Sequence, residues 1–163
     1  MKPVTAKGAR NRYERGLVLL QEMQLHRITL GLVLIDIEET NSCSLLGFNS
    51  FGSFCSAPIT SGGFGLRERT RQTTMQVART FVLELGIQAR ELLDIAYSNL
   101  AIIVPVVNED NLEEVLSDAK CLGARDLALN KKAGKYTGGT EPYDAENETE
   151  RRMTTCPNCG TRF

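Results

Sequence analysis

The chain has 163 residues, of which 42% are hydrophobic and 24% are charged. This composition is typical of a globular protein of about one domain, and it excludes wholesale disorder and a collagen-like fibre. A formal net charge of −1 excludes a uniformly basic nucleic-acid coat. The longest apolar runs, residues 30–35 and 100–107, fall far short of the roughly 18 residues that span a bilayer. Because the five cysteines are odd in number, we expect a reducing, cytoplasmic setting without membrane contact.

The N-terminal third of the sequence predicts a helix followed by a strand. Residues 5–25 carry Tyr13, Leu17 and Leu20 at helical spacing, which favours an amphipathic helix. Residues 27–37 are continuously rich in Ile, Leu and Val, which favours a strand buried on both faces and leaves a helix as the alternative.

Three carboxylates come at the end of that predicted strand: Asp36, Glu38 and Glu39. In open α/β sheets, acid–base groups and metal ligands often lie at the ends of strands. A solvated loop after a core strand is the alternative interpretation.

Residues 40–65 hold five glycines, six serines, four phenylalanines and no charged side chain. Glycine and serine favour loops. A loop that exposed four aromatic rings to water would be unfavourable, because each ring offers about 150–250 Å² of mainly apolar surface. We therefore expect Phe48, Phe51, Phe54 and Phe64 to be covered by the core, a second subunit or a ligand.

The end of this loop is a candidate anion-binding segment. Gly62, Gly63 and Gly65 precede a run that begins with Leu66 and Arg67. A glycine-rich loop before a helix can direct backbone N–H groups at a phosphate, and an arginine can add bidentate contacts. A hinge before a helix is the alternative, since the segment matches neither the P-loop nor the dinucleotide-binding pattern.

The C-terminal half predicts an α/β or α+β domain. Helices are expected over residues 77–85, which Gly86 would end, and over residues 88–98. Residues 100–107 resemble an edge strand with an irregularity at Pro105, and a capped helix follows from Asp110 to Gly123. With a short returning strand at 126–130, these segments predict a βαβ unit inside a core domain of residues 1–133.

Residues 134–152 read as a flexible linker, because five acids stand between 141 and 150 with few apolar side chains. The tail of residues 153–163 contains Cys156-Pro157-Asn158-Cys159-Gly160. This pattern resembles the knuckle of zinc-ribbon and rubredoxin-like proteins, in which two thiolates three positions apart reach one tetrahedral ion. The resemblance covers about eight residues and implies zinc, or iron as the alternative, with Cys156 and Cys159 as ligands.

A closed zinc site has four ligands, and the chain has one such knuckle. The remaining two ligands are expected from Cys43 with Cys55, from Cys121 with His26, or from the same pair in a second copy of the chain. Zinc shared between copies would make the chain a homo-oligomer. A redox-active or metal-handling dithiol and an inert tail are the other interpretations of the motif.

These observations predict a non-catalytic docking, assembly or regulatory protein with a zinc knuckle. We expect its core to contact a protein partner in preference to nucleic acid. If the partner is nucleic acid, we expect the contacts to come from the basic N-terminus and from Arg67, Arg69, Arg71 and Arg79. The alternative is a small enzyme that binds a phosphorylated ligand through residues 61–65 and the same arginines, with Asp36 or Glu38 as the acid–base or metal-binding group.

Overall fold

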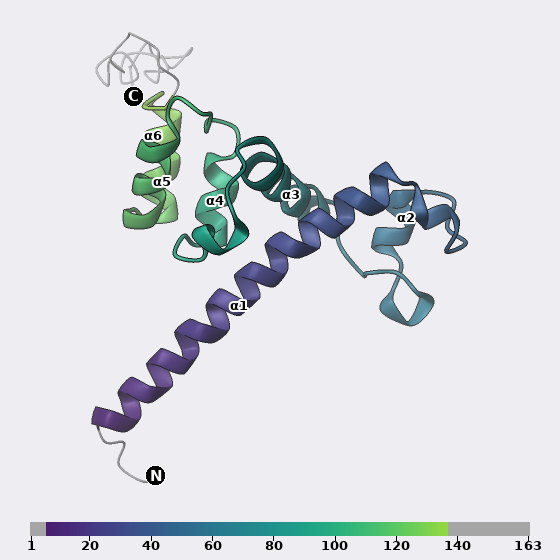
Figure 1. Ribbon diagram of the computed structural model, residues 1–163, viewed down its shortest axis with the longest axis horizontal. Helices are drawn as coiled ribbons and strands as arrows, with labels where there is room; N and C mark the ends of the chain where they lie inside the picture. Colours follow the sequence, from purple (N-terminus) through teal and green to yellow (C-terminus); the bar gives the residue numbers. More distant parts are fainter. Residues whose placement is uncertain (1–5, 137–163) are drawn as a thin grey trace, which may run out of the picture.

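The computed structural model describes residues 6–136, and these residues form helices and contain no strand. The predicted α/β class and its βαβ unit are therefore wrong, and the fold is helical. Figure 1 shows a long first helix crossing a group of shorter ones. In chain order the elements are α1 Ala6–Glu39, η1 Ser42–Ser44, α2 Phe51–Ser56, η2 Ile59–Ser61, α3 Glu68–Ala78, η3 Arg79–Glu84, η4 Ala89–Leu92, α4 Tyr97–Ile103, α5 Leu112–Cys121 and α6 Ala124–Lys132.

Helix α1 continues through the segment that the sequence predicted as a strand, residues 27–37. Neither glycine nor proline separates the first helical pattern from the second, so nothing ends the helix at residue 26. Ile28, Leu34 and Ile35 are buried, whereas Val33 is 44% exposed. The apolar run is thus one buried helix face with an exposed apolar neighbour, and not a strand covered on both faces.

The crossing of α1 and α3 organises the core. Two buried clusters flank it: one joins Ile28 to Val77, Phe81 and the helices that follow, and the other joins Leu34 to Met75 and the α2 region. A side chain on Gly31 would come within 2.4 Å of the Thr74 carbonyl oxygen, so only glycine permits this close approach. The helices at the crossing therefore meet backbone to backbone.

The helix predicted over residues 77–85 is the end of a longer one. α3 runs on into η3, a π-helical stretch that buries Phe81 completely. Gly86 follows with a φ of 67°, and it ends the helix as predicted. The predicted helix over residues 88–98 is instead the 3₁₀ turn η4 followed by the start of α4.

The segments predicted as strands at 100–107 and 126–130 are helical. α4 ends at Ile103, two residues before Pro105, and residues 126–130 lie within α6. Asn99 is buried on α4, and its amide donates to the carbonyl oxygens of Ala119 and Leu122 at 2.9 and 3.0 Å. The branched side chains Leu100 and Ile103 pack against Val115 and Leu127 in a helix–helix core.

Within the described part of the chain, one helix is long and apolar enough to cross a membrane when judged by length and composition alone, and it is the Arg10–Glu39 portion of α1. The core helix of a soluble protein and a signal sequence near the N-terminus satisfy the same criterion. Localisation thus stays a prediction.

Candidate functional site

An apolar stripe runs along the N-terminal half of α1. Tyr13, Leu17 and Leu20 are spaced by four and three residues, so they share one helix face, and they are 66%, 41% and 63% exposed. Further along α1 the same spacing leads through Gln24 to Ile28 and Ile35, which α3 and the following helices bury. Figure 1 shows that this half of α1 extends beyond the other helices. One continuous face is therefore covered at one end and bare at the other; we call Tyr13, Leu17 and Leu20 the α1 stripe.

A groove begins where α1 meets the turn between η4 and α4. Its volume is about 540 Å³, and its α1 side includes Leu17, Leu20 and Met23. The opposite side is formed by Leu93, Asp94, Ala96 and Tyr97. The groove is thus a continuation of the α1 stripe onto the body of the protein, with an apolar floor and one acid at its edge.

Polar side chains of α1 hold it against this turn. The Gln24 amide donates to the carbonyl oxygens of Leu92 and Ile95, and the Leu92 carbonyl also accepts from the Ile95 N–H. The Arg27 guanidinium lies over the Tyr97 ring, 4.0 Å from its centroid. Burial raises the pKa of the Tyr97 hydroxyl, which faces the carbonyl oxygen of Thr73 at 3.5 Å. These contacts make one wall of the groove rigid.

The glycine-rich segment packs internally. The amides of Gly62, Gly63 and Gly65 donate to the carbonyl oxygens of Ile59, Pro58 and Ala57. Gly63 is buried so closely that a Cβ would lie 2.5 Å from the Phe54 carbonyl oxygen. These amides are therefore used within the loop, and the role of Gly62, Gly63 and Gly65 in binding a cofactor stays a prediction without a structural counterpart.

Arg67, the fourth residue of that predicted site, lies elsewhere. It precedes the first turn of α3 and lines a cleft together with Arg69 and with Arg27 of α1. Forty residues separate Arg27 from Arg67, so no motif in the sequence pointed to their meeting. The structure thus joins the predicted arginine to another arginine that sequence reasoning missed.

The aromatic loop is covered by its own domain. Phe54 is buried and makes edge-to-face contacts with Phe48 and Phe64, at centroid distances of 5.2 and 4.9 Å. Phe51 lies under the Arg71 guanidinium at 5.2 Å. The sequence left open whether the core, a second subunit or a ligand covers these rings, and the structure shows that the core does.

The cysteines of the described residues, Cys43, Cys55 and Cys121, form no disulfide. Cys43 and Cys55 lie in the same apolar cluster, and burial raises the pKa of the Cys55 thiol although Arg71 opposes the shift. Cys121, at the end of α5, is exposed. Burial keeps Cys43 and Cys55 from reaching a metal held outside the core.

The carboxylates predicted to act in acid–base or metal chemistry stand on the last turns of α1. Asp36 and Glu39 are exposed, and Glu38 forms an ion pair with Arg79 at 3.8 Å. Among residues 6–136 no group of three His, Cys, Asp or Glu side chains could hold a metal ion. The predicted zinc ligands Cys156 and Cys159 lie outside the described residues, as do residues 137–152 of the predicted linker.

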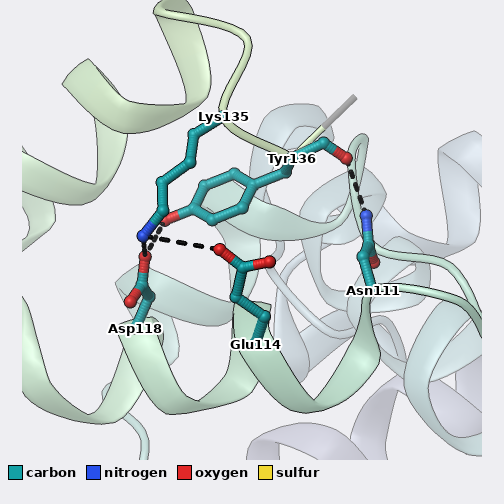
Figure 2. Close-up of polar contacts among 5 residues, drawn as sticks. All are labelled: Asn111, Glu114, Asp118, Lys135 and Tyr136. Atoms are coloured by element: carbon teal, nitrogen blue, oxygen red, sulfur yellow. Dashed lines mark hydrogen bonds and ion pairs between the residues drawn. The ribbon is translucent and has the colours of Figure 1, made fainter. Parts of the chain in front are cut away.

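The last described residues pack onto α5. In Figure 2 the Asp118 carboxylate accepts hydrogen bonds from the Lys135 ammonium and the Tyr136 hydroxyl, both at 2.6 Å. Asn111 donates to the Tyr136 carbonyl oxygen at 2.8 Å, and Glu114 lies 3.6 Å from Lys135. These bonds lower the pKa of Asp118 and raise that of Lys135. The body of the protein therefore extends to Tyr136.

The comparisons with known proteins give no match: no protein-family model, no curated protein and no solved structure is similar to the chain. The α1 stripe, its groove and the arginine cleft are therefore interpreted from their own geometry.

Proposed function

We propose that the chain is a non-catalytic assembly protein that docks onto a macromolecular partner as a dimer, and that the dimer forms through the α1 stripe. The bare continuation of a face that is elsewhere buried carries this proposal. Fully burying a Leu side chain contributes about 1.5–3 kcal/mol, and covering the exposed parts of Leu17 and Leu20 gains a share of this for each. Contiguous exposed apolar patches mark interaction sites, and Val18, Leu19 and Met23 enlarge this patch because they are exposed as well.

A second copy of the chain is the occupant that best fits this surface. In a two-fold dimer each subunit presents the same patch to the other. Leu17 and Leu20 line the groove and also belong to the exposed stripe, so the stripe of one copy can enter the groove of the other and be entered in return. The net charge of −1 gives two copies no long-range repulsion.

The direction of pairing follows from charge. Arg10, Arg12 and Arg15 stand near the start of α1, where one acid, Glu14, already pairs with Arg10. Parallel helices would bring these basic ends together. Antiparallel helices instead keep the two basic ends apart. We therefore propose antiparallel α1 helices.

The C-terminal segment of the same chain is a poorer occupant. Residues 141–150 contain five acids, and Tyr143 is their one large apolar side chain. Such a segment has too few apolar side chains to cover the three exposed residues of the stripe and shield them from water. A bilayer span would have to accept the charge of Glu22 within the apolar half of the helix.

The test is the native mass of the full chain with Leu17→Glu and Leu20→Glu together. We expect a dimer for the unmodified chain and a folded monomer of 18.0 kDa for the variant. Leu129→Glu is the matched control, because Leu129 is 55% exposed on α6, away from the stripe, and this variant must remain a dimer. A monomeric mass for the unmodified chain in buffer overturns the proposal. Flotation of the unmodified chain as a monomer with anionic lipid vesicles overturns it as well.

The zinc knuckle remains part of the proposed function. Cys156 and Cys159 supply two thiolates, and the exposed Cys121 and His26 are better placed to accept a metal than the buried Cys43 and Cys55. In a dimer, the same pair from the second copy would complete four thiolates. The test is the zinc content per chain: we expect one zinc for ligands within a chain, half for a shared site, and none after Cys156→Ser. No zinc in the reduced, unmodified chain contradicts this part of the proposal.

A further inference from the structure

The arginine cleft lies between α3 and α4 and has a volume of about 630 Å³. Arg27, Arg67 and Arg69 contribute three positive charges to its lining, and no lining side chain is a carboxylate. Glu68, between two of these arginines, lines a different pocket beside Cys55 and accepts a hydrogen bond from Gln72 at 3.1 Å. The cleft therefore gathers positive charge that no acid in its wall neutralises.

The remaining polar groups of the cleft suit phosphate oxygens. Thr70, Thr73 and Ser98 bring hydroxyl groups, and Gln76 brings an amide. Hydroxyls and guanidinium groups are usual donors to a phosphate.

Arg27 is held ready for such a contact. The carbon of its guanidinium lies over the Tyr97 ring, 4.0 Å from the centroid, and this cation–π contact uses none of its N–H donors in a hydrogen bond to the ring. The Tyr97 ring is in turn part of the cleft wall. Arg27 thus loses little conformational freedom on binding, because the ring has already restricted it.

We propose that this cleft binds the backbone phosphates of a double-stranded nucleic acid. Small-molecule sites bury most of their ligand, whereas here all three arginines are exposed at the surface. An open, basic cleft fits a polyanion that lies across it. This inference rests on the proposed function and names the class of partner that it leaves open. It does not depend on how two copies of the chain pair.

The test is the binding of the full chain to a fluorescent 20-base-pair DNA duplex of random sequence, measured by anisotropy over a range of KCl concentrations. Each phosphate contact contributes about 0.9 to the slope of log affinity against log salt. We expect Arg67→Gln with Arg69→Gln to reduce the slope by about two and to weaken binding at low salt by about tenfold or more. Arg27→Gln is expected to reduce the slope by about one.

Arg125→Gln is the matched control, because Arg125 is exposed on α6 and does not line the cleft. Its slope and affinity must equal those of the unmodified chain. Duplex binding that is absent, or that is unchanged in both cleft variants, overturns the proposal. The proposal is also overturned if the duplex does not bind but inorganic tripolyphosphate does, and if the cleft variants lose that binding. This result would identify a small phosphorylated ligand. The native mass of each variant, read separately, reports on the dimer.

Discussion

Gly31 of α1 lies against Thr74 of α3 so closely that a methyl group on Gly31 would stand 2.4 Å from the Thr74 carbonyl oxygen and 2.6 Å from the Ala78 Cβ. Backbone atoms on one helix cannot move away without shifting the helix. The crossing that places both the α1 stripe and Arg27 therefore depends on the absence of a side chain at this position.

Gly31→Ala is expected to lower the free energy of unfolding by about 1–3 kcal/mol, because the new methyl group overpacks the crossing. Gly16→Ala on the same helix is the control, since nothing lies within 4 Å of the added Cβ. There we expect a gain of up to about 1 kcal/mol from helix propensity. Urea unfolding followed by circular dichroism measures both. Equal stabilities for the two variants would contradict the observed crossing.

Asn99→Asp is expected to destabilise the protein by about 2–4 kcal/mol. It replaces an amide that donates to two carbonyl oxygens with a carboxylate that repels them, and Asn99 is buried. Asn99→Leu leaves the same two carbonyls without this donor and is expected to cost less. Exposed Asn108→Asp serves as the reference for the charge change. A destabilisation below that of Asn108→Asp would count against the buried hydrogen bonds.

Asp118→Asn is expected to flatten the dependence of stability on acid pH. The pKa of Asp118 is lowered, by Lys135 first and Tyr136 second, so its contribution is present above the ordinary carboxyl pKa of about 3.9 and is lost as the pH falls through the lower folded value. The unmodified chain and the variant should differ most above the ordinary carboxyl pKa of about 3.9 and converge as the pH falls below it. Urea midpoints at several pH values measure this, and a constant difference would show that Asp118 acts other than by its charge.

The stabilising contributions of Lys135 and Tyr136, in the same cluster, are expected to be lost at alkaline pH. The pKa of Lys135 is raised by Asp118, and burial raises that of Tyr136, so both contributions are complete below the ordinary values near 10 and are lost as the pH rises through the folded values. Asp118 keeps its charge over that range.

Thiol modification should separate the three described cysteines. Cys121 is exposed, whereas Cys43 and Cys55 are buried and burial raises the pKa of Cys55. With Cys156 and Cys159 replaced by serine, iodoacetamide at pH 8 is expected to label Cys121 at least about tenfold faster than the other two. Peptide mass spectrometry follows the labelling, and urea should equalise the rates. Rapid labelling of Cys55 in the folded chain would be inconsistent with its burial.

Local patterns in the sequence predicted parts of the fold correctly and others wrongly, for reasons that specific residues show. Tyr13, Leu17 and Leu20 marked a helix face, and Gly86 marked a helix end. The run around Val33 was misread because an apolar residue at an exposed helix position makes the pattern look continuous. Leu100 and Ile103 were misread because branched residues suit strands and buried helices alike once tertiary packing decides.

The candidate sites were harder to predict than the helices. The continuity between Leu20 and Ile28 is visible in the spacing, but only if residues 27–37 are taken as helix. The meeting of Arg27 with Arg67 depends on how α1 crosses α3, and no sequence spacing encodes that crossing. Zinc binding by Cys156 and Cys159 stays a prediction, because both residues lie outside the described part of the chain.

The pairing of two α1 stripes is tested most directly by the sedimentation-equilibrium mass of the chain carrying Cys156→Ser and Cys159→Ser, in the presence of a metal chelator. These conditions remove any link through shared zinc, so a dimer that persists must be held by another surface. We expect twice the chain mass of 18.0 kDa with a Kd below about 100 μM, and 18.0 kDa when Leu17→Glu and Leu20→Glu are added. A mass of 18.0 kDa before those two changes are made would contradict the account.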